Sequence, residues 1–172
     1  MQKCIMFILS MFAAAPAFAK GGWIRDAGDF LQVIVPAYAA GMAVQEGGWD
    51  GILQFAEAFT ATEITQMGLK AIVPAERPDH SDKKSFPSGH TAAAFSGATF
   101  MHKRYGWRRA VLPYAMASFV GFSRVYANKH YIWDVAAGAA IAGMWTWAFV
   151  DESPLRISAG PSGAWLGFRT IF

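Results

Sequence analysis

The stretch RPDHSDKKSFPSGHT, residues 77–91, gathers cations, hydroxyls, a glycine and two histidines between segments that are mostly apolar. Apolar runs of helical length lie on both sides of it, at residues 30–44, 52–73, 91–102, 110–123 and 133–150. No segment before residue 151 alternates in the way that a half-buried strand requires. The sequence therefore predicts an all-α fold, a compact bundle of about five to six helices with the polar stretch, and the active site, at helix ends.

Length and composition favour one folded domain and exclude some functions. The chain has 172 residues, of which 54% are hydrophobic and 16% charged, so it can bury a core and is not disordered. The net charge is only +3, and the basic residues are scattered through loops without a basic aromatic stripe. We therefore predict no nucleic-acid partner.

Residues 1–19, MQKCIMFILSMFAAAPAFA, have the pattern of a secretory signal peptide. Lys3 supplies the positive start, and Ala17-Phe18-Ala19 is an A-x-A cleavage site. The alternative is an uncleaved first membrane helix, but the apolar stretch is shorter than the roughly 20 residues of a span. The only cysteine, Cys4, lies inside this segment, so the mature chain holds neither a disulfide nor a thiolate metal site.

The remaining chain is predicted to divide into a helical domain over residues 20–150 and a tail over residues 151–172. For the tail we favour a docked or loose segment over a strand. The uninterrupted apolar cores at 33–44, 110–121 and 135–150 hold 12, 12 and 16 residues, which is short for a membrane span. We therefore favour a soluble or membrane-associated protein exported to a bacterial periplasm. The alternative is an inner-membrane protein whose active site faces the periplasm, which several tryptophans near helix ends would suit.

Three short patterns stand at the ends of the predicted helices. They are Lys70-x6-Arg77-Pro78, Pro87-Ser88-Gly89-His90 and Ser123-Arg124-x5-His130-x3-Asp134. Arg77 and Arg124 each offer a planar fork to two phosphate oxygens, and Lys70 adds a point charge. Ser88 and Gly89 stand where a helix begins, and free N–H groups there bind anions. Together the patterns predict a phosphate site.

The histidines of these patterns turn a phosphate site into a candidate catalytic one. His130 and Asp134 share a helix face, so the carboxylate can take the Nδ1 proton and aim Nε2 at phosphorus as a nucleophile. His90 can give a proton to the leaving oxygen and then act as a base toward water. No metal ligand cluster is evident, and no cofactor is expected. We interpret His80 as a loop residue and His102 as a helix-end residue.

In order and spacing, the three patterns resemble the signature of the type 2 phosphatidic acid phosphatase superfamily. That superfamily includes bacterial non-specific acid phosphatases and vanadium haloperoxidases, and its signature is KxxxxxxRP, PSGH and SRxxxxxHxxxD. The resemblance implies a helical bundle and a phosphatase that is independent of metals and forms a phosphohistidine at His130. It also implies that Lys70, Arg77, Ser88, Gly89 and Arg124 hold the phosphate, with His90 as the acid and Asp134 orienting His130.

The substrate stays open at this point. A lipid phosphate, an isoprenoid pyrophosphate and a small soluble phosphoester all suit the predicted site, and the oligomeric state is not determined. Two alternatives remain: a vanadium-dependent haloperoxidase with His130 as the ligand of vanadate, and a non-catalytic protein that binds phosphate or a lipid phosphate. The second would not explain why two histidines and Asp134 accompany the cations.

Overall fold

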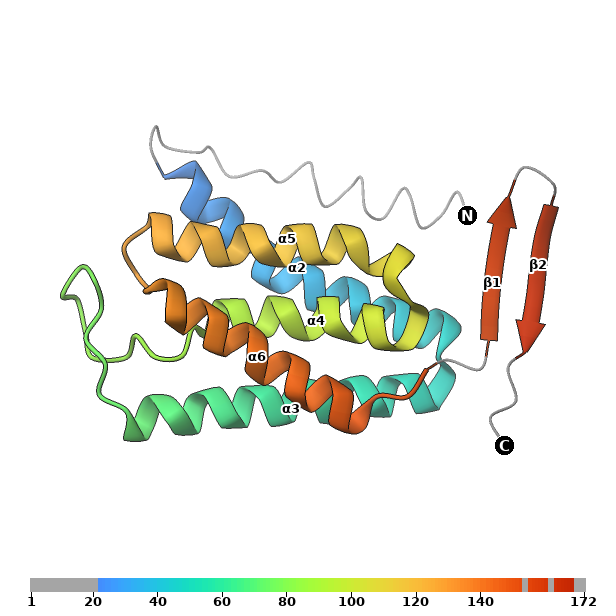
Figure 1. Cartoon of the computed structure of the whole chain (residues 1–172), viewed down its shortest axis with the longest axis horizontal. Helices are drawn as coiled ribbons and strands as arrows, with labels where there is room; N and C mark the ends of the chain where they lie inside the picture. The colour runs from blue at the N-terminus through green and yellow to red at the C-terminus, as the bar shows by residue number, and fades with distance from the viewer. Residues whose placement is uncertain (1–21, 153–154, 161–162, 169–172) are drawn as a thin grey trace.

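The computed structural model describes residues 22–152, 155–160 and 163–168, which form five helices and a two-stranded hairpin (Figure 1). The predicted signal peptide, residues 1–19, lies outside the described residues. The helices are α2 (Trp23–Glu46), α3 (Gly48–Ile72), α4 (Gly89–Tyr105), α5 (Trp107–Tyr126) and α6 (Ile132–Phe149). The predicted helical bundle is confirmed.

Local sequence explains most of the helix boundaries. Helix α4 begins after Ser88, whose Oγ accepts a hydrogen bond from the backbone N–H of Thr91, and ends at Gly106, whose φ of 88° favours glycine. Helix α3 ends shortly before Pro74. One boundary was predicted wrongly, because α2 starts at Trp23 and not near residue 30.

All three predicted motifs lie at the same end of the bundle. Figure 1 shows the α3–α4 connection and the α5–α6 connection at this end, together with the start of α2. The short α2–α3 and α4–α5 turns lie at the opposite end because successive helices reverse direction. Helix α4 packs against each of the other four helices and forms the centre of the core.

The outer helices bury small or polar residues and expose large apolar ones. On α3 the buried residues are Gly51, Ala58, Thr62 and Gln66. On the same helix Ile64 is 65% exposed and Met67 is 63% exposed. Helix α6 likewise buries Gly138, Ala142 and Thr146 and exposes Met144 and Trp147. Ala56, within the apolar run at residues 52–73, is also exposed.

Small residues let the helices approach closely. A Cβ at Gly138 of α6 would lie 2.5 Å from the backbone oxygen of Ser88, at the start of α4. A Cβ at Gly97 of α4 would lie 2.7 Å from the backbone oxygen of Val35 on α2, beside the buried Pro36. These contacts hold α2 and α6 against the central helix.

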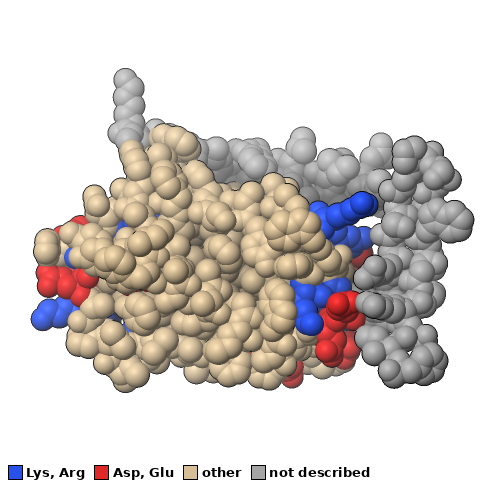
Figure 2. Space-filling model, viewed as in Figure 1, with Lys and Arg blue, Asp and Glu red and all other residues tan. Residues whose placement is uncertain are grey.

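On one face of the bundle, charged side chains are seen mainly toward its two ends (Figure 2). On the face seen in Figure 2, the middle of the bundle shows no Lys, Arg, Asp or Glu. Among the described residues, only α2 is long and apolar enough to count as a candidate membrane span.

The tail contains regular structure that the sequence did not lead us to expect. Strand β1 (Leu155–Gly160) pairs antiparallel with β2 (Gly163–Phe168), in a register that places Leu155 opposite Phe168. The expectation of a docked or loose tail is therefore wrong for these residues. Apolar alternation on both sides of the sequence Pro161-Ser162-Gly163 is a pattern that favours such a hairpin.

Candidate active site

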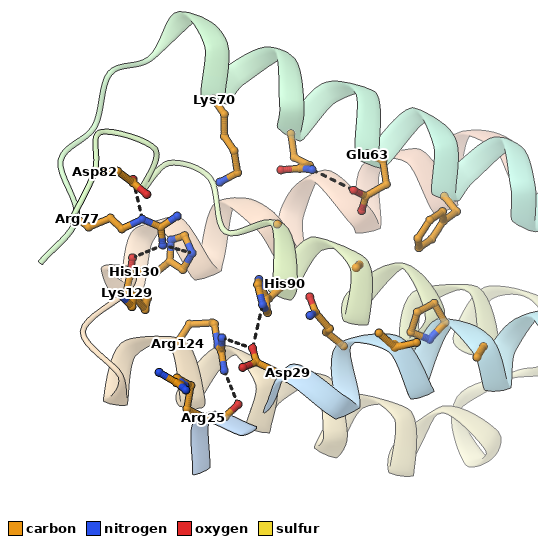
Figure 3. A pocket seen from close by; sticks show the side chains of 18 of the residues that line it. Arg25, Asp29, Glu63, Lys70, Arg77, Asp82, His90, Arg124, Lys129 and His130 are labelled. Carbon is orange, nitrogen blue, oxygen red and sulfur yellow. Dashed lines mark hydrogen bonds and ion pairs between the residues drawn. The ribbon is translucent and has the colours of Figure 1, made fainter. Parts of the chain in front are cut away.

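A cavity of about 1030 Å³ opens at the motif-bearing end of the bundle, between α2 and α3 and against α4 (Figure 3). Six of the eight predicted site residues line it: Lys70, Arg77, Gly89, His90, Arg124 and His130. The other two, Ser88 and Asp134, are buried behind its wall. The tertiary structure thus brings together residues that are up to 60 positions apart in the chain, from Lys70 to His130.

The Arg77 guanidinium lies directly against His130. Its Nη1 is 3.4 Å from His130 Nε2 and donates to the backbone oxygen of Lys129 at 3.1 Å. Its Nε donates to Asp82 Oδ1 at 2.7 Å. Lys70 approaches from α3 and donates to the backbone oxygens of Lys84 and Pro87, just before the helix that carries Gly89. Two cations therefore flank the predicted nucleophile.

The hydrogen bond of His130 fixes which ring nitrogen carries the proton. Nδ1 lies 2.7 Å from the backbone oxygen of Ser85, which can only accept, so Nδ1 carries the hydrogen. Burial lowers the pKa of His130, and the charges of Arg77 and Lys70 lower it further. The ring is therefore neutral near pH 7, and the lone pair on Nε2 faces the Arg77 Nη1 donor at 3.4 Å.

Asp134 does not make the predicted hydrogen bond to His130. Its Oδ2 is 3.6 Å from Nδ1, and it accepts instead from Ser85 Oγ and from the backbone N–H of Tyr131 at 2.9 Å. Asp134 thereby links the start of α6 to Ser85, whose backbone carbonyl orients His130. Its negative charge acts on His130 at short range, but the Ser85 carbonyl is the direct partner.

Arg124 is held firmly in the opposite wall of the cavity. Its side chain is 4% exposed, and Nη1 donates to Asp29 Oδ1 at 2.6 Å. Nη2 donates to the backbone oxygen of Arg25 at 2.7 Å, and Nε donates to Ser123 Oγ at 3.0 Å. Ser123, for which the motif offered no chemical role, therefore orients this guanidinium.

Asp29 is a site residue that the sequence analysis missed. The oxygen that accepts from Arg124 also lies 3.0 Å from His90 Nε2, so one carboxylate joins the predicted acid to a predicted phosphate ligand (Figure 3). The first apolar run predicts a helix from residue 30, which leaves Asp29 outside it, whereas α2 begins at Trp23. A carboxylate at the start of an apolar helix is the signal that could have found it.

Ser88 serves the site through the backbone. Its side chain is fully buried, and its Oγ caps α4 and lies 3.0 Å from Thr91 Oγ1. The N-terminus of α4 therefore faces the cavity at Gly89, where backbone N–H groups and the positive end of the helix dipole favour an anion.

The other two histidines lie outside this arrangement, as predicted. His80 is exposed in the 73–88 loop, where it pairs with Glu76. His102 lies in the last turn of α4, among the rings of Trp107, Tyr114 and Trp147.

Chemically, the cavity offers a neutral imidazole nitrogen, the three cations predicted to bind phosphate and a helix N-terminus around one space. Such a site can bind a tetrahedral anion and present a nucleophile to it. A second imidazole, His90, stands across the cavity in contact with Asp29.

Comparisons with known proteins agree with this geometry. The PAP2 superfamily profile matches residues 51–156. The Lipid A 4'-phosphatase of Helicobacter pylori is 30% identical over 146 residues, which cover 78% of this chain and 72% of that protein. The Lipid A 1-phosphatase of Porphyromonas gingivalis is 48% identical over 68 residues, 38% of this chain and only 15% of the relative's length. Phosphatidylglycerophosphatase B of Bacillus subtilis is 29% identical over 133 residues, 67% of this chain and 64% of the relative.

Solved structures share the architecture. Aquifex aeolicus LpxE superposes with a TM-score of 0.62 at 20% identity, covering 76% of this chain and 87% of that one. A transmembrane PAP2-type phosphatidylglycerolphosphate phosphatase from Bacillus subtilis superposes with a TM-score of 0.54 at 26% identity, covering 73% and 71%. The profile match spans more than half of the chain and includes all three motifs. The chain therefore belongs to the PAP2 superfamily.

Proposed function

We propose that the protein is a membrane-embedded, metal-independent phosphatase that hydrolyses a lipid phosphate or pyrophosphate through a phosphohistidine at His130. The observation that carries this proposal is the shape of the cavity. At one end are His130 and the cations, and at the other the walls are apolar, formed by Val33, Pro36, Ala37, Ala40, Phe55 and Phe59. A polar headgroup and an attached chain match these two ends.

The exposed surface supports embedding in a bilayer. Large apolar side chains stand outward on four helices, including Ile64 at 65%, Leu112 at 68% and Trp147 at 51% exposure. A soluble monomer rarely exposes a contiguous apolar patch of more than a few hundred Å². Small residues at helix contacts, as at Gly97 and Gly138, are typical of helices that pack within lipid. We therefore prefer the inner-membrane alternative to a soluble periplasmic protein.

In the proposed first step, His130 Nε2 attacks phosphorus in line with the leaving oxygen. The phosphorus–oxygen bond breaks, and His90 gives its proton to the departing alkoxide or phosphate. Lys70, Arg77 and Arg124 stabilise the charge on the equatorial oxygens of the transition state. In the second step, water attacks the phosphohistidine while His90 takes the water's proton, and inorganic phosphate leaves.

A substrate panel on the purified full chain in detergent tests the proposal. We expect phosphate release from phosphatidate, phosphatidylglycerophosphate or undecaprenyl pyrophosphate to exceed release from p-nitrophenyl phosphate. Activity should resist EDTA and fall with vanadate, which mimics the transition state. Halide oxidation with peroxide and vanadate, without phosphate release, would instead favour the haloperoxidase alternative.

A pair of variants tests the lipid part separately. Ala37 lines the apolar end of the cavity, so Ala37→Phe should reduce hydrolysis of long-chain substrates while sparing p-nitrophenyl phosphate. Ala56→Phe places the same ring at an exposed position of α3 that does not line the cavity, and it serves as the control. Equal loss on both substrates in Ala37→Phe would contradict a chain-binding groove.

A further inference from the structure

Among the described residues, two buried acceptor oxygens in the cavity wall have no hydrogen-bond partner. They are Glu63 Oε1 and Gln66 Oε1, and both residues line the cavity from α3. Gln66 is only 6% exposed, and its Nε2 donates to Glu63 Oε2 at 3.0 Å (Figure 3). This bond fixes both side chains and leaves one oxygen of each without a donor.

These oxygens lie between the phosphate site and the apolar end of the cavity. Gln66 is about one helical turn from Lys70, and Glu63 is about two turns from it. Gln66 Oε1 faces the start of α4, since a Cβ built at Gly89 would lie 3.0 Å from it. Phe59 lies about one further turn along from Glu63 and lines the apolar end. A substrate with its phosphate at His130 would therefore place the atoms next to its phosphate beside this pair.

An unpartnered buried acceptor is unfavourable, and native proteins keep few of them. A hydrogen-bond donor on the substrate would satisfy these oxygens and remove the free-energy penalty, whereas an apolar substituent would leave the penalty in place. We propose that Glu63 and Gln66 recognise hydroxyl or amide N–H donors next to the phosphoryl group, and so select polyol or sugar phosphates over plain alkyl phosphates. This inference rests on the proposed function and narrows its substrate class.

The expected selectivity is large because sites built to bind a donor reject an analogue that lacks it. One hydrogen bond to a charged acceptor corresponds to roughly a ten- to hundredfold change in kcat/KM.

The test uses two substrates that differ by one hydroxyl, 1-dodecylglycerol 3-phosphate and its 2-deoxy analogue, 3-(dodecyloxy)propyl phosphate. Phosphate release is measured with the full chain in detergent micelles. We expect the wild type to prefer the hydroxylated substrate at least tenfold in kcat/KM. Glu63→Leu and Gln66→Leu should move this ratio toward one, while Glu63→Gln, which keeps an acceptor oxygen, should retain part of it. Glu57→Leu, at an exposed position of the same helix, is the matched control and should leave the ratio unchanged.

The outcomes separate the inference from the proposed function. Wild-type activity on both substrates with a ratio near one would overturn the inference and leave the function standing. A preference that Glu63→Leu and Gln66→Leu do not reduce would also overturn it. Failure of the wild type to release phosphate from either substrate, and from every lipid phosphate and pyrophosphate of the substrate panel, would overturn the proposed function itself. The wild-type ratio of kcat/KM for the two substrates can overturn the inference by itself, so the test stays decisive even if a variant fails to fold.

Discussion

Replacement of Asp29 by asparagine should slow turnover without weakening substrate binding. Asp29 Oδ1 accepts from Arg124 at 2.6 Å and lies 3.0 Å from His90 Nε2, so one charge supports two partners. A hydrogen bond to a charged group contributes about 1.5–3 kcal/mol. Because the Asp29 side chain is 42% exposed, solvent screens it, and we take the lower part of that range, about 1.5–2 kcal/mol. This corresponds to a loss of roughly 10- to 30-fold in kcat.

The KM should stay the same or fall, because the substitution removes a negative charge from the wall of an anion site. The assay is steady-state phosphate release with a lipid phosphate in micelles, with kcat and KM determined separately. Asp26→Asn is the control, since Asp26 lies one turn earlier on α2 and pairs with Arg25. A wild-type kcat in Asp29→Asn, or a change confined to a higher KM, would refute the view that Asp29 positions His90.

Three further predictions concern the nucleophile, the pH dependence and the packing of α4. His130→Ala should abolish turnover while the helical circular dichroism is kept, and acid-labile phosphoenzyme should be trapped only in the wild type. Because burial and nearby cations lower the pKa of His130, the neutral ring persists below its ordinary value of about 6.5, and the acid limb of kcat/KM should lie below that pH. Since His90 must start protonated, an optimum above about pH 9 would contradict its role as the acid. Gly138→Val should lower stability by about 1–3 kcal/mol in thermal unfolding, because its side chain would meet the backbone of Ser88, whereas a Cβ at Gly143 meets no atom of the described residues within 4 Å, so Gly143→Val is the control.

The helical fold and six residues that line the cavity could be predicted from sequence because both depend on local patterns. Apolar runs separated by polar loops predict helices, and each motif keeps its spacing within one short segment. Asp29 could not be assigned in the same way, since its partners Arg124 and His90 lie 95 and 61 positions away. The role of Asp134 was misjudged for a related reason. An i,i+4 spacing predicts proximity to His130, but the nearer acceptor, the Ser85 carbonyl, comes from another loop.

Sequence patterns also left open which side chains face outward from the bundle. The short apolar cores predict a protein that does not span the bilayer. That prediction was incomplete because hydropathy along one helix does not show which of its faces points outward from the bundle. Only the packed bundle decides that α3 and α6 turn small and polar residues inward and large apolar ones outward. That distribution underlies the proposal of a membrane-embedded enzyme.

The sequence by itself determined the class of fold, the family and the types of residue at the site, because these follow from local patterns and motif spacing. Only the tertiary structure decided which partner orients each histidine: Ser85 for His130 and Asp29 for His90. It also decided that the stretch RPDHSDKKSFPSGHT forms one wall of a cavity whose other walls come from α2, α3 and the α5–α6 connection. Hydrogen bonds and cavities depend on distances between segments remote in the chain, and those distances are set only when the helices pack.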